Sequence, residues 1–285
     1  MDHNIIKTGV IKTEIIKDRP RTLKTRKKRN PQKTQNPVVN ARGCAIGHKP
    51  PPHPTYDERR GLGANDNKNN DQLTPHRVFK PDTYPEYFKS GDITVSWGPW
   101  RFLACPTANI KCPDCGNFPF HFGCLVVDID GDCASNIPNK GEPTCSMGVF
   151  FGHNNEYNVA TKVKETPNTA QVALLKACLS ALITTINVCQ VDKPKHGNEY
   201  THPLHTLVLR TDSLYIFQGV TEWMPKWKAN GWKNSRGRPI ANDSLWRMVD
   251  VWIRHLEPTV AVQFWLVPRE QNPTAHSMTK WALEN

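Results

Sequence analysis

Aspartates occur where two apolar segments of the sequence end. Asp128, Asp130 and Asp132 alternate at the end of the first segment, and Asp212 follows the second, residues 206–209. Side chains two residues apart on a strand lie on one face, and acids at strand ends in an α/β sheet can converge on one point. Such carboxylates can share divalent metal ions, which orient and activate water for phosphodiester hydrolysis. The sequence therefore predicts a metal-binding site centred on Asp130 and Asp212.

A sheet flanked by helices is needed to bring these acids together. From residue 122 onward, apolar patterning predicts both strands and helices. The expected strands are 122–130, 144–151, 158–162, 206–209 and 260–267, and the expected helices are 168–188, a segment from about 212, 242–256 and a segment from about 272. This order indicates an α/β domain with a mixed five-stranded sheet and helices on both faces. Residues 93–97 could form a further short strand.

A second group of residues has the spacing of metal ligands. Cys112 and Cys115 are separated by two residues, so their thiolates could chelate one zinc ion from a tight turn. Two further ligands would be needed, and the candidates are Cys105, His121 and Cys124. The alternative is that these are ordinary buried or loop cysteines. Four other cysteines are expected to be small core residues rather than disulfide partners, namely Cys133, Cys145, Cys178 and Cys189.

Positive charge is concentrated at the N-terminal end. The net charge is +11, and residues 1–50 hold 13 of the 37 Lys and Arg residues but only three acids. A basic segment of this kind attracts phosphate without sequence preference. It fits a solvated disordered arm, and residues 26–29 also fit a nuclear import signal. The sequence shows neither a membrane-spanning apolar run nor a secretory signal core, which favours a nuclear or cytoplasmic protein.

Three regions are therefore expected. Residues 1–75 are predicted to be a basic, proline-rich disordered region, and residues 76–121 a cysteine-containing linker or small zinc-binding segment. Residues 122–285 are predicted to form the α/β domain.

Five sequence motifs of this last region resemble those of type 1 ribonuclease H, in the same order. They are Ile129–Cys133 (IDGDC), Thr166–Val172 (TPNTAQV), Arg210–Tyr215 (RTDSLY), the tryptophan- and lysine-rich Trp223–Trp246, and Val267–Asn272 (VPREQN). The resemblance implies the ribonuclease H-like fold and binding of RNA–DNA hybrids. It also implies hydrolysis of the RNA strand with divalent metal ions.

The resemblance also shows that the catalytic set is incomplete. The family uses Asp, Glu, Asp and Asp around two magnesium ions. Asp130 and Asp212 match the first and third positions, whereas Gln171 stands at the Glu position and His276 at the last Asp position. Because Mg²⁺ prefers hard anionic oxygens and imidazole suits softer ions, a weakened Mg²⁺ or Mn²⁺ site is expected. Nearby acids could compensate, namely Asp128, Asp132 and Glu165.

Two functional hypotheses remain open from the sequence. The first is an enzyme that binds hybrids and cleaves the RNA strand with reduced activity. The alternative is a catalytically inactive nucleic-acid-binding pseudoenzyme. A folded interaction module without a hybrid role is a third reading, which the intact basic protrusion of residues 223–246 disfavours.

The resemblance also assigns candidate nucleic-acid contacts. They are Asn136, Asn168 and Ser213, together with Lys226, Trp227, Lys228, Trp232, Lys233, Arg236 and Arg238 of the protrusion. The competing interpretation is that the tryptophans, with Trp223 and Trp246, pack in the core or protrusion, while the basic residues form a solvated face. A monomer without membrane contact is expected.

Overall fold

The computed structural model describes residues 75–285 except for 114, 135–142, 165–167 and 190–202. The strands are β1 (Thr94–Trp97), β2 (Trp100–Ala104), β3 (Phe120–Cys133), β4 (Cys145–Phe150), β5 (Val159–Val163), β6 (Thr206–Thr211) and β7 (Ala261–Leu266). The α-helices are α2 (Ala170–Cys189), α3 (Leu214–Gln218), α4 (Met224–Ala229), α5 (Asp243–Leu256) and α6 (Pro273–Glu284). A π-helical turn over Gly219–Trp223 joins α3 to α4, and a 3-10 turn over Arg269–Gln271 precedes α6.

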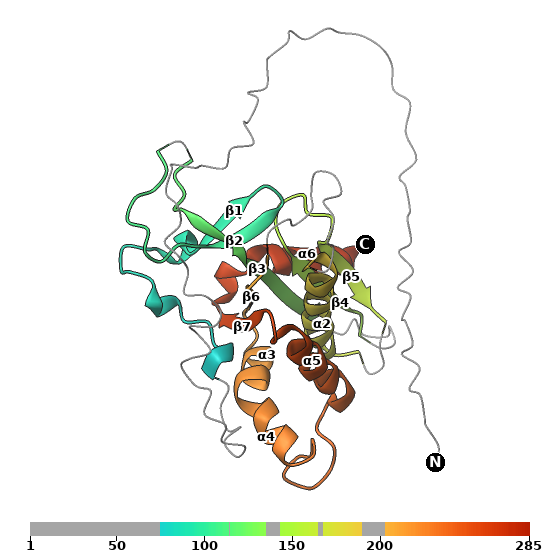
Figure 1. Cartoon of the computed structure of the whole chain (residues 1–285). Helices are drawn as coiled ribbons and strands as arrows, with labels where there is room; N and C mark the ends of the chain where they lie inside the picture. Colours follow the sequence, from blue (N-terminus) through green and yellow to red (C-terminus); the bar gives the residue numbers. More distant parts are fainter. Residues whose placement is uncertain (1–74, 114, 135–142, 165–167, 190–202) are drawn as a thin grey trace, which may run out of the picture. The chain divides into compact units, whose positions relative to one another are not determined.

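All seven strands form one mixed sheet around β3 (Figure 1). The strand β3 pairs antiparallel with β2 and β4 along one edge and parallel with β6 along the other. The strand β5 pairs with β4, and β7 pairs in parallel with β6. The five expected strands correspond to β3–β7, so the mixed topology is confirmed.

Helices cover both faces of the sheet. A Cβ at Gly131 of β3 would collide with the backbone of Leu174 in α2, whereas a Cβ at Gly148 of β4 would collide with the backbone of Ala275 in α6. Gly148 is the register partner of Asp130, the residue before Gly131, so the two glycines face opposite sides. The helix α2 therefore covers one face and α6 the other, as expected.

The largest core lies between the sheet and α2. Its centre includes Leu125, Val127 and Ile129 of β3, and α2 contributes Leu175 and Leu182. Within the described part of the chain, α2 alone is long and apolar enough to cross a membrane, but 67% of that stretch is buried inside the protein. This burial explains the apolar composition of α2, since the helix packs against the central strand.

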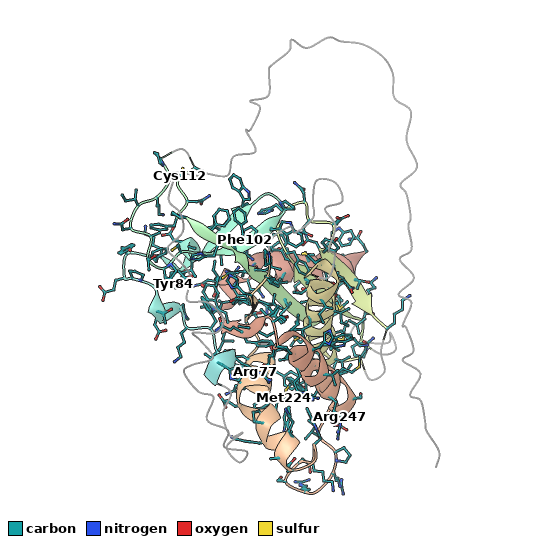
Figure 2. All side chains as sticks on the ribbon, viewed as in Figure 1. Arg77, Tyr84, Phe102, Cys112, Met224 and Arg247 are labelled. Carbon is teal, nitrogen blue, oxygen red and sulfur yellow. A yellow bond between two sulfur atoms is a disulfide. The ribbon has the colours of Figure 1, made fainter. Side chains whose placement is uncertain are left out.

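The N-terminal part of the described chain joins the same sheet. The hairpin of β1 and β2 pairs with the first half of β3, and Val78 forms a parallel bridge to Phe264 of β7. Arg77 is buried beside Met224 and forms an ion pair with Glu257 at 2.8 Å (Figure 2). The boundary expected at residue 121 thus falls inside β3. The described residues that precede this boundary are integrated into the same fold. The expected disordered region, residues 1–75, lies outside the described residues except for residue 75.

Two cysteines differ from the sequence expectation. Cys133 and Cys145 form a disulfide because the last residue of β3 and the first of β4 are direct partners in the antiparallel register. Cys178 is fully buried in the core, and burial raises the pKa of its thiol to about 12. The side chain of Cys189 lies outside the described residues.

Candidate functional site

The two predicted aspartates lie together at the ends of neighbouring strands. Asp130 belongs to β3 and Asp212 directly follows β6, which runs parallel to β3. The fully buried Asn272 joins them, since its amide nitrogen donates to the carbonyl oxygen of Ile129 at 3.1 Å and to a carboxylate oxygen of Asp212 at 3.2 Å. The predicted convergence of acids therefore holds for this pair.

Asp130 is nearly buried and strongly hydrogen-bonded. Its Oδ1 accepts from the backbone of Gly131 at 2.8 Å, and its Oδ2 accepts from His276 Nδ1 at 3.0 Å and from the Thr279 hydroxyl at 3.3 Å. Burial, followed by the charge of Asp212, raises the pKa of Asp130, while the hydrogen bond from His276 acts in the opposite direction. The imidazole of His276 therefore stabilises the charged form of this carboxylate.

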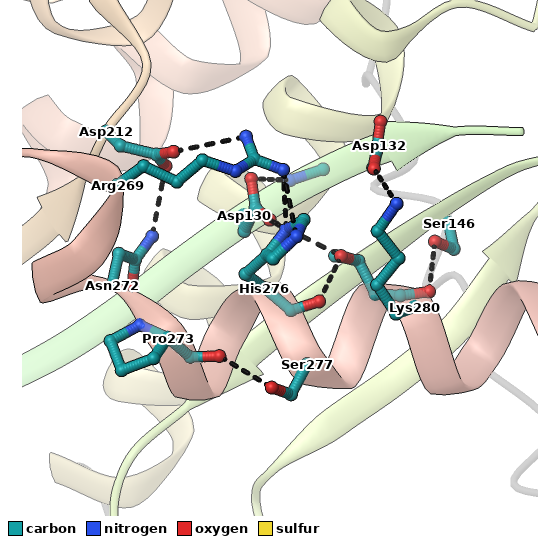
Figure 3. A network of polar contacts seen from close by, with 12 residues as sticks. Asp130, Asp132, Ser146, Asp212, Arg269, Asn272, Pro273, His276, Ser277 and Lys280 are labelled. Atoms are coloured by element: carbon teal, nitrogen blue, oxygen red, sulfur yellow. Dashed lines mark hydrogen bonds and ion pairs between the residues drawn. The ribbon is translucent and has the colours of Figure 1, made fainter. Parts of the chain in front are cut away.

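Arg269 links Asp212 to His276 from the solvent side. One terminal nitrogen lies 3.5 Å from Asp212 Oδ2, and the other lies 2.8 Å and 2.9 Å from the two ring nitrogens of His276 (Figure 3). If His276 Nδ1 donates to Asp130, Nε2 remains to accept from Arg269. The side chain of Arg269 is 54% exposed, whereas that of Asp212 is 11% exposed. Where the family resemblance predicts metal ions, a guanidinium group therefore lies against Asp212 and against the histidine that contacts Asp130.

Two of the three acids expected to compensate are already paired. Asp128 accepts a bidentate pair of hydrogen bonds from Arg210, both at 2.8 Å, and lies 2.5 Å from Arg101. Its side chain is 2% exposed, so this triad is closed to a metal ion. Asp132 lies 3.4 Å from Lys280 of α6. Glu165 lies outside the described residues.

This set of residues does not fit a pair of magnesium ions. Mg²⁺ requires several hard oxygen ligands, and both remaining aspartates contact cationic or imidazole groups. Gln171 lies exposed in the first turn of α2, where a neutral amide replaces the expected carboxylate. Among the described residues, no three Asp, Glu, His or Cys side chains are arranged to hold a metal ion.

The basic protrusion, residues 223–246, includes α4 and the turn that follows it. Its exposed cations are Lys226, Lys233, Arg236 and Arg238. Lys228 is half-buried and lies 3.4 Å from Asp250 of α5. Hydrogen bonds from the backbone of Arg236 and Arg238 to the side chain of Asn234 fix the turn. Four exposed cations on one protrusion form a suitable surface for backbone phosphates.

The tryptophans of this region pack mainly against one another. The ring of Trp227 packs in a tilted arrangement against those of Trp223 and Trp246, with centroid distances of 5.7 Å and 5.3 Å. Trp232 is only 8% exposed, and Trp246 is fully buried with its indole nitrogen donating to the Tyr215 hydroxyl. This arrangement favours the packing interpretation and leaves little of Trp232 to contact a ligand.

The other expected nucleic-acid contacts lie near the start of α2 and α3. Asn168 is half-buried, and its side-chain amide oxygen, Oδ1, is buried without a hydrogen-bond partner in the described structure. Ser213 caps α3, since its hydroxyl accepts from the backbone of Ile216 at 3.4 Å. Asn136 lies outside the described residues.

Three of the candidate zinc ligands, Cys105, Cys112 and Cys115, lie in the loop between β2 and β3, whereas His121 and Cys124 lie in β3. Cys105, Cys112 and Cys124 are buried, whereas Cys115 is exposed. Cys124 lies 3.8 Å from His205, and Cys105 lies 3.1 Å from the Thr107 hydroxyl. A zinc ion at these cysteines stays a prediction.

Three residues at the site were not predicted as functional. Arg269 and Asn272 belong to the VPREQN motif, but the motif alone does not show that they contact Asp212. Lys280 lies four residues after His276 on α6, so helical spacing placed both on one face. Such spacing was the available signal for Lys280.

Comparisons with known proteins agree with the five sequence motifs that resemble type 1 ribonuclease H. The ribonuclease H family pattern matches residues 125–265. A ribonuclease H from Xanthomonas campestris pv. campestris is 40% identical over 122 residues, which is 43% of this chain and 67% of that protein. One from a Cyanothece species is 31% identical over 121 residues, which is 42% of this chain and 65%, slightly less than two thirds, of that protein. The solution structure of the PFV RNase H domain aligns with a TM-score of 0.38 at 16% identity, covering 55% of this chain and 92% of that domain.

Proposed function

We propose that this chain, which belongs to the ribonuclease H family, binds RNA–DNA hybrids without a metal ion and has lost efficient Mg²⁺-dependent cleavage of the RNA strand. One observation carries this proposal. Arg269 lies against both Asp212 and His276, and His276 donates to Asp130, so the two remaining catalytic-type aspartates are satisfied by protein groups.

Binding is supported by the surface that remains. The family resemblance extends through the protrusion, and four of its basic side chains are exposed. Phosphate contacts of this kind give affinity that does not require a metal ion at the catalytic centre. The hybrid rather than another duplex is proposed because of family membership.

Loss of cleavage follows from what a guanidinium group lacks. A metal ion in such a site lowers the pKa of a bound water and holds the attacking and leaving oxygens. Arg269 can neutralise Asp212 and donate hydrogen bonds, but it cannot coordinate and ionise a water molecule. Replacement of two carboxylates by Gln171 and His276 removes anionic ligands that would favour a metal ion over this arginine.

The test compares binding and cleavage of one labelled hybrid in Mg²⁺ and in EDTA. Fluorescence anisotropy should give dissociation constants that agree within about threefold, because roughly 0.7 kcal/mol is the most that screening alone should contribute. Gel analysis should show little RNA cleavage in Mg²⁺. Binding that disappears in EDTA, or rapid wild-type cleavage in Mg²⁺, contradicts the proposal.

A second candidate function is residual cleavage with a softer metal. It is favoured by the retained pair of Asp130 and Asp212, and by the imidazole of His276 beside Asp130. Imidazole is a better ligand for Mn²⁺ than for Mg²⁺. A titration with Mn²⁺ that produces cleavage, and its loss in Asp130→Asn, would support this function over the non-enzymatic one.

A further inference from the structure

We propose that Arg269, His276 and Lys280 form a metal-free binding site for the phosphodiester backbone of nucleic acid. These three residues, of which Arg269 and Lys280 carry the positive charge, are called the α6 cation surface below. The inference rests on the proposed hybrid binding and extends it, because it adds a second phosphate-binding surface distinct from the protrusion.

On this surface the cationic side chains lie nearer to solvent than the carboxylates they contact. The side chains of Arg269 and Lys280 are each 54% exposed. Their partners Asp212 and Asp132 are 11% and 28% exposed, and the side chain of Asp130 is 5% exposed. An approaching polyanion therefore meets the cations first, with the carboxylates lying underneath.

Each of the four aspartates around this surface already has a protein partner. Asp128 contacts two arginines, Asp132 contacts Lys280, Asp212 contacts Arg269 and Asp130 accepts from His276. A cluster of unpaired carboxylates would repel phosphate unless metal ions neutralised it. Here Arg269 and Lys280 supply part of that neutralisation, which lessens the need for metal ions when a phosphate approaches.

Arg269 and Lys280 carry more N–H donors than their contacts within the protein engage. A guanidinium carries five N–H donors and an ammonium carries three. The contacts of Arg269 to Asp212 and His276, and the contact of Lys280 to Asp132, engage only some of these donors. The remaining donors can reach a phosphate, and an arginine fork matches phosphate geometry.

The backbone that carries these three residues is fixed to the sheet. His276 and Lys280 lie four residues apart on one face of α6, while Arg269 lies in the turn before it (Figure 3). Asn272 links this turn to both β3 and Asp212 through hydrogen bonds. The cations are therefore held on an element that the sheet positions, which reduces the entropy lost when a phosphate binds.

The experiment measures hybrid affinity against salt concentration in EDTA. The variants are Arg269→Gln, Lys280→Gln and the double variant of the full chain. Each cation that contacts a phosphate should contribute roughly 0.9 to the slope of log Kd against log salt, so the double variant should lose about 1.8. Between 50 and 200 mM salt, wild-type affinity should then fall about 12-fold more than that of the double variant.

A matched control is Lys111→Gln. Lys111 is 43% exposed and pairs with Asp92 at 2.6 Å, so this variant also removes an exposed lysine from an ion pair, but in the loop between β2 and β3. Its salt slope should equal that of wild type. Thermal unfolding confirms that each variant is folded before affinity is compared.

A second measurement changes the nucleic acid and compares wild type with the double variant. Hybrids are prepared with one neutral methylphosphonate at successive backbone positions. At one or two positions the substitution should weaken wild-type binding, whereas the double variant should be indifferent to it there. This non-additivity identifies a direct contact.

The outcomes separate the two proposals. If wild type binds no hybrid in EDTA, the proposed function fails. If wild type binds in EDTA but the double variant keeps the wild-type slope and the methylphosphonate response, the α6 cation surface is refuted and the protrusion alone accounts for binding. Salt slopes reduced equally by Lys111→Gln would likewise overturn the inference, because the effect would then reflect net charge only.

Discussion

Restoring the two missing carboxylates should restore a magnesium site. The change is Gln171→Glu combined with His276→Asp, which rebuilds the family's four acids. Gln171 is exposed, so an added charge there costs little packing. His276 Nδ1 lies 3.0 Å from Asp130 Oδ2, so a side chain at position 276 already points at the retained aspartate.

The change should make stability depend on magnesium. Without metal, the variant loses the hydrogen bond from His276 to Asp130, a charged interaction of about 1.5–3 kcal/mol, and gains like-charge repulsion. Magnesium at about 100 times its Kd should return about 2.7 kcal/mol of unfolding free energy. For a domain of this size, that corresponds to a rise in Tm of roughly 5–10 °C.

The assay combines differential scanning fluorimetry with single-turnover cleavage of a labelled hybrid. In Mg²⁺ the variant should cleave at least about tenfold faster than wild type, which needs only about 1.4 kcal/mol of barrier. Asp130→Asn in the variant background should abolish both the cleavage and the magnesium-dependent rise in Tm. Wild type in the same buffer is the control, and its Tm should not respond to Mg²⁺.

Two results would refute this reasoning. Full Mg²⁺-dependent activity in wild type would mean that another acid completes the site, in spite of the ion pairs of Asp128 and Asp132. A double variant that binds hybrid but shows neither cleavage nor magnesium-dependent stability would mean that more than two ligands have been lost.

Three further predictions follow from the same structure. Alanine at the four exposed cations of the protrusion should flatten the salt dependence of hybrid binding, whereas Lys228→Ala, which loses a contact to Asp250, should change it less. Asp128→Asn should lower the free energy of unfolding by about 3–5 kcal/mol in urea titrations, because Arg101 and Arg210 would remain buried without their carboxylate. Burial opposes ionisation of Glu257, but hydrogen bonds from His76 and Arg77 outweigh it and lower its pKa from 4.5 to about 2. The stabilisation that the charged Glu257 contributes is therefore present above pH 4.5 and is lost as pH falls towards 2. Glu257→Gln should remove this part of the acid transition in urea titrations repeated at each pH.

The sequence predicted the elements whose signals are local. Short apolar runs identified β3 and β6, and the acids at their ends could be expected to meet because neighbouring parallel strands end at one edge. The position of helix α2 followed from its apolar spacing. These features depend on short segments and on one topological rule.

The remaining features depend on contacts between distant segments. Asp128 shares a face with Asp130, and only the three-dimensional register shows that Arg210 and Arg101 converge on it from separate strands. The disulfide between Cys133 and Cys145 likewise depends on the antiparallel register across a connection that separates the two residues by 12 positions. Local composition carries no information about such pairings.

The addition of the β1–β2 hairpin and the arrangement of charges near Asp130 are physically connected. Arg101 comes from β2, which pairs with the first half of β3, and its guanidinium reaches Asp128, two residues before Asp130. Burial of a second arginine at this carboxylate is tolerable only while the carboxylate stays charged and paired. Asp128 is thereby committed to holding the hairpin on the sheet and cannot act as a metal ligand. The same strand therefore uses one acid to anchor an extension and the next, Asp130, to receive His276, which leaves the cations of α6 as the groups that face a phosphate.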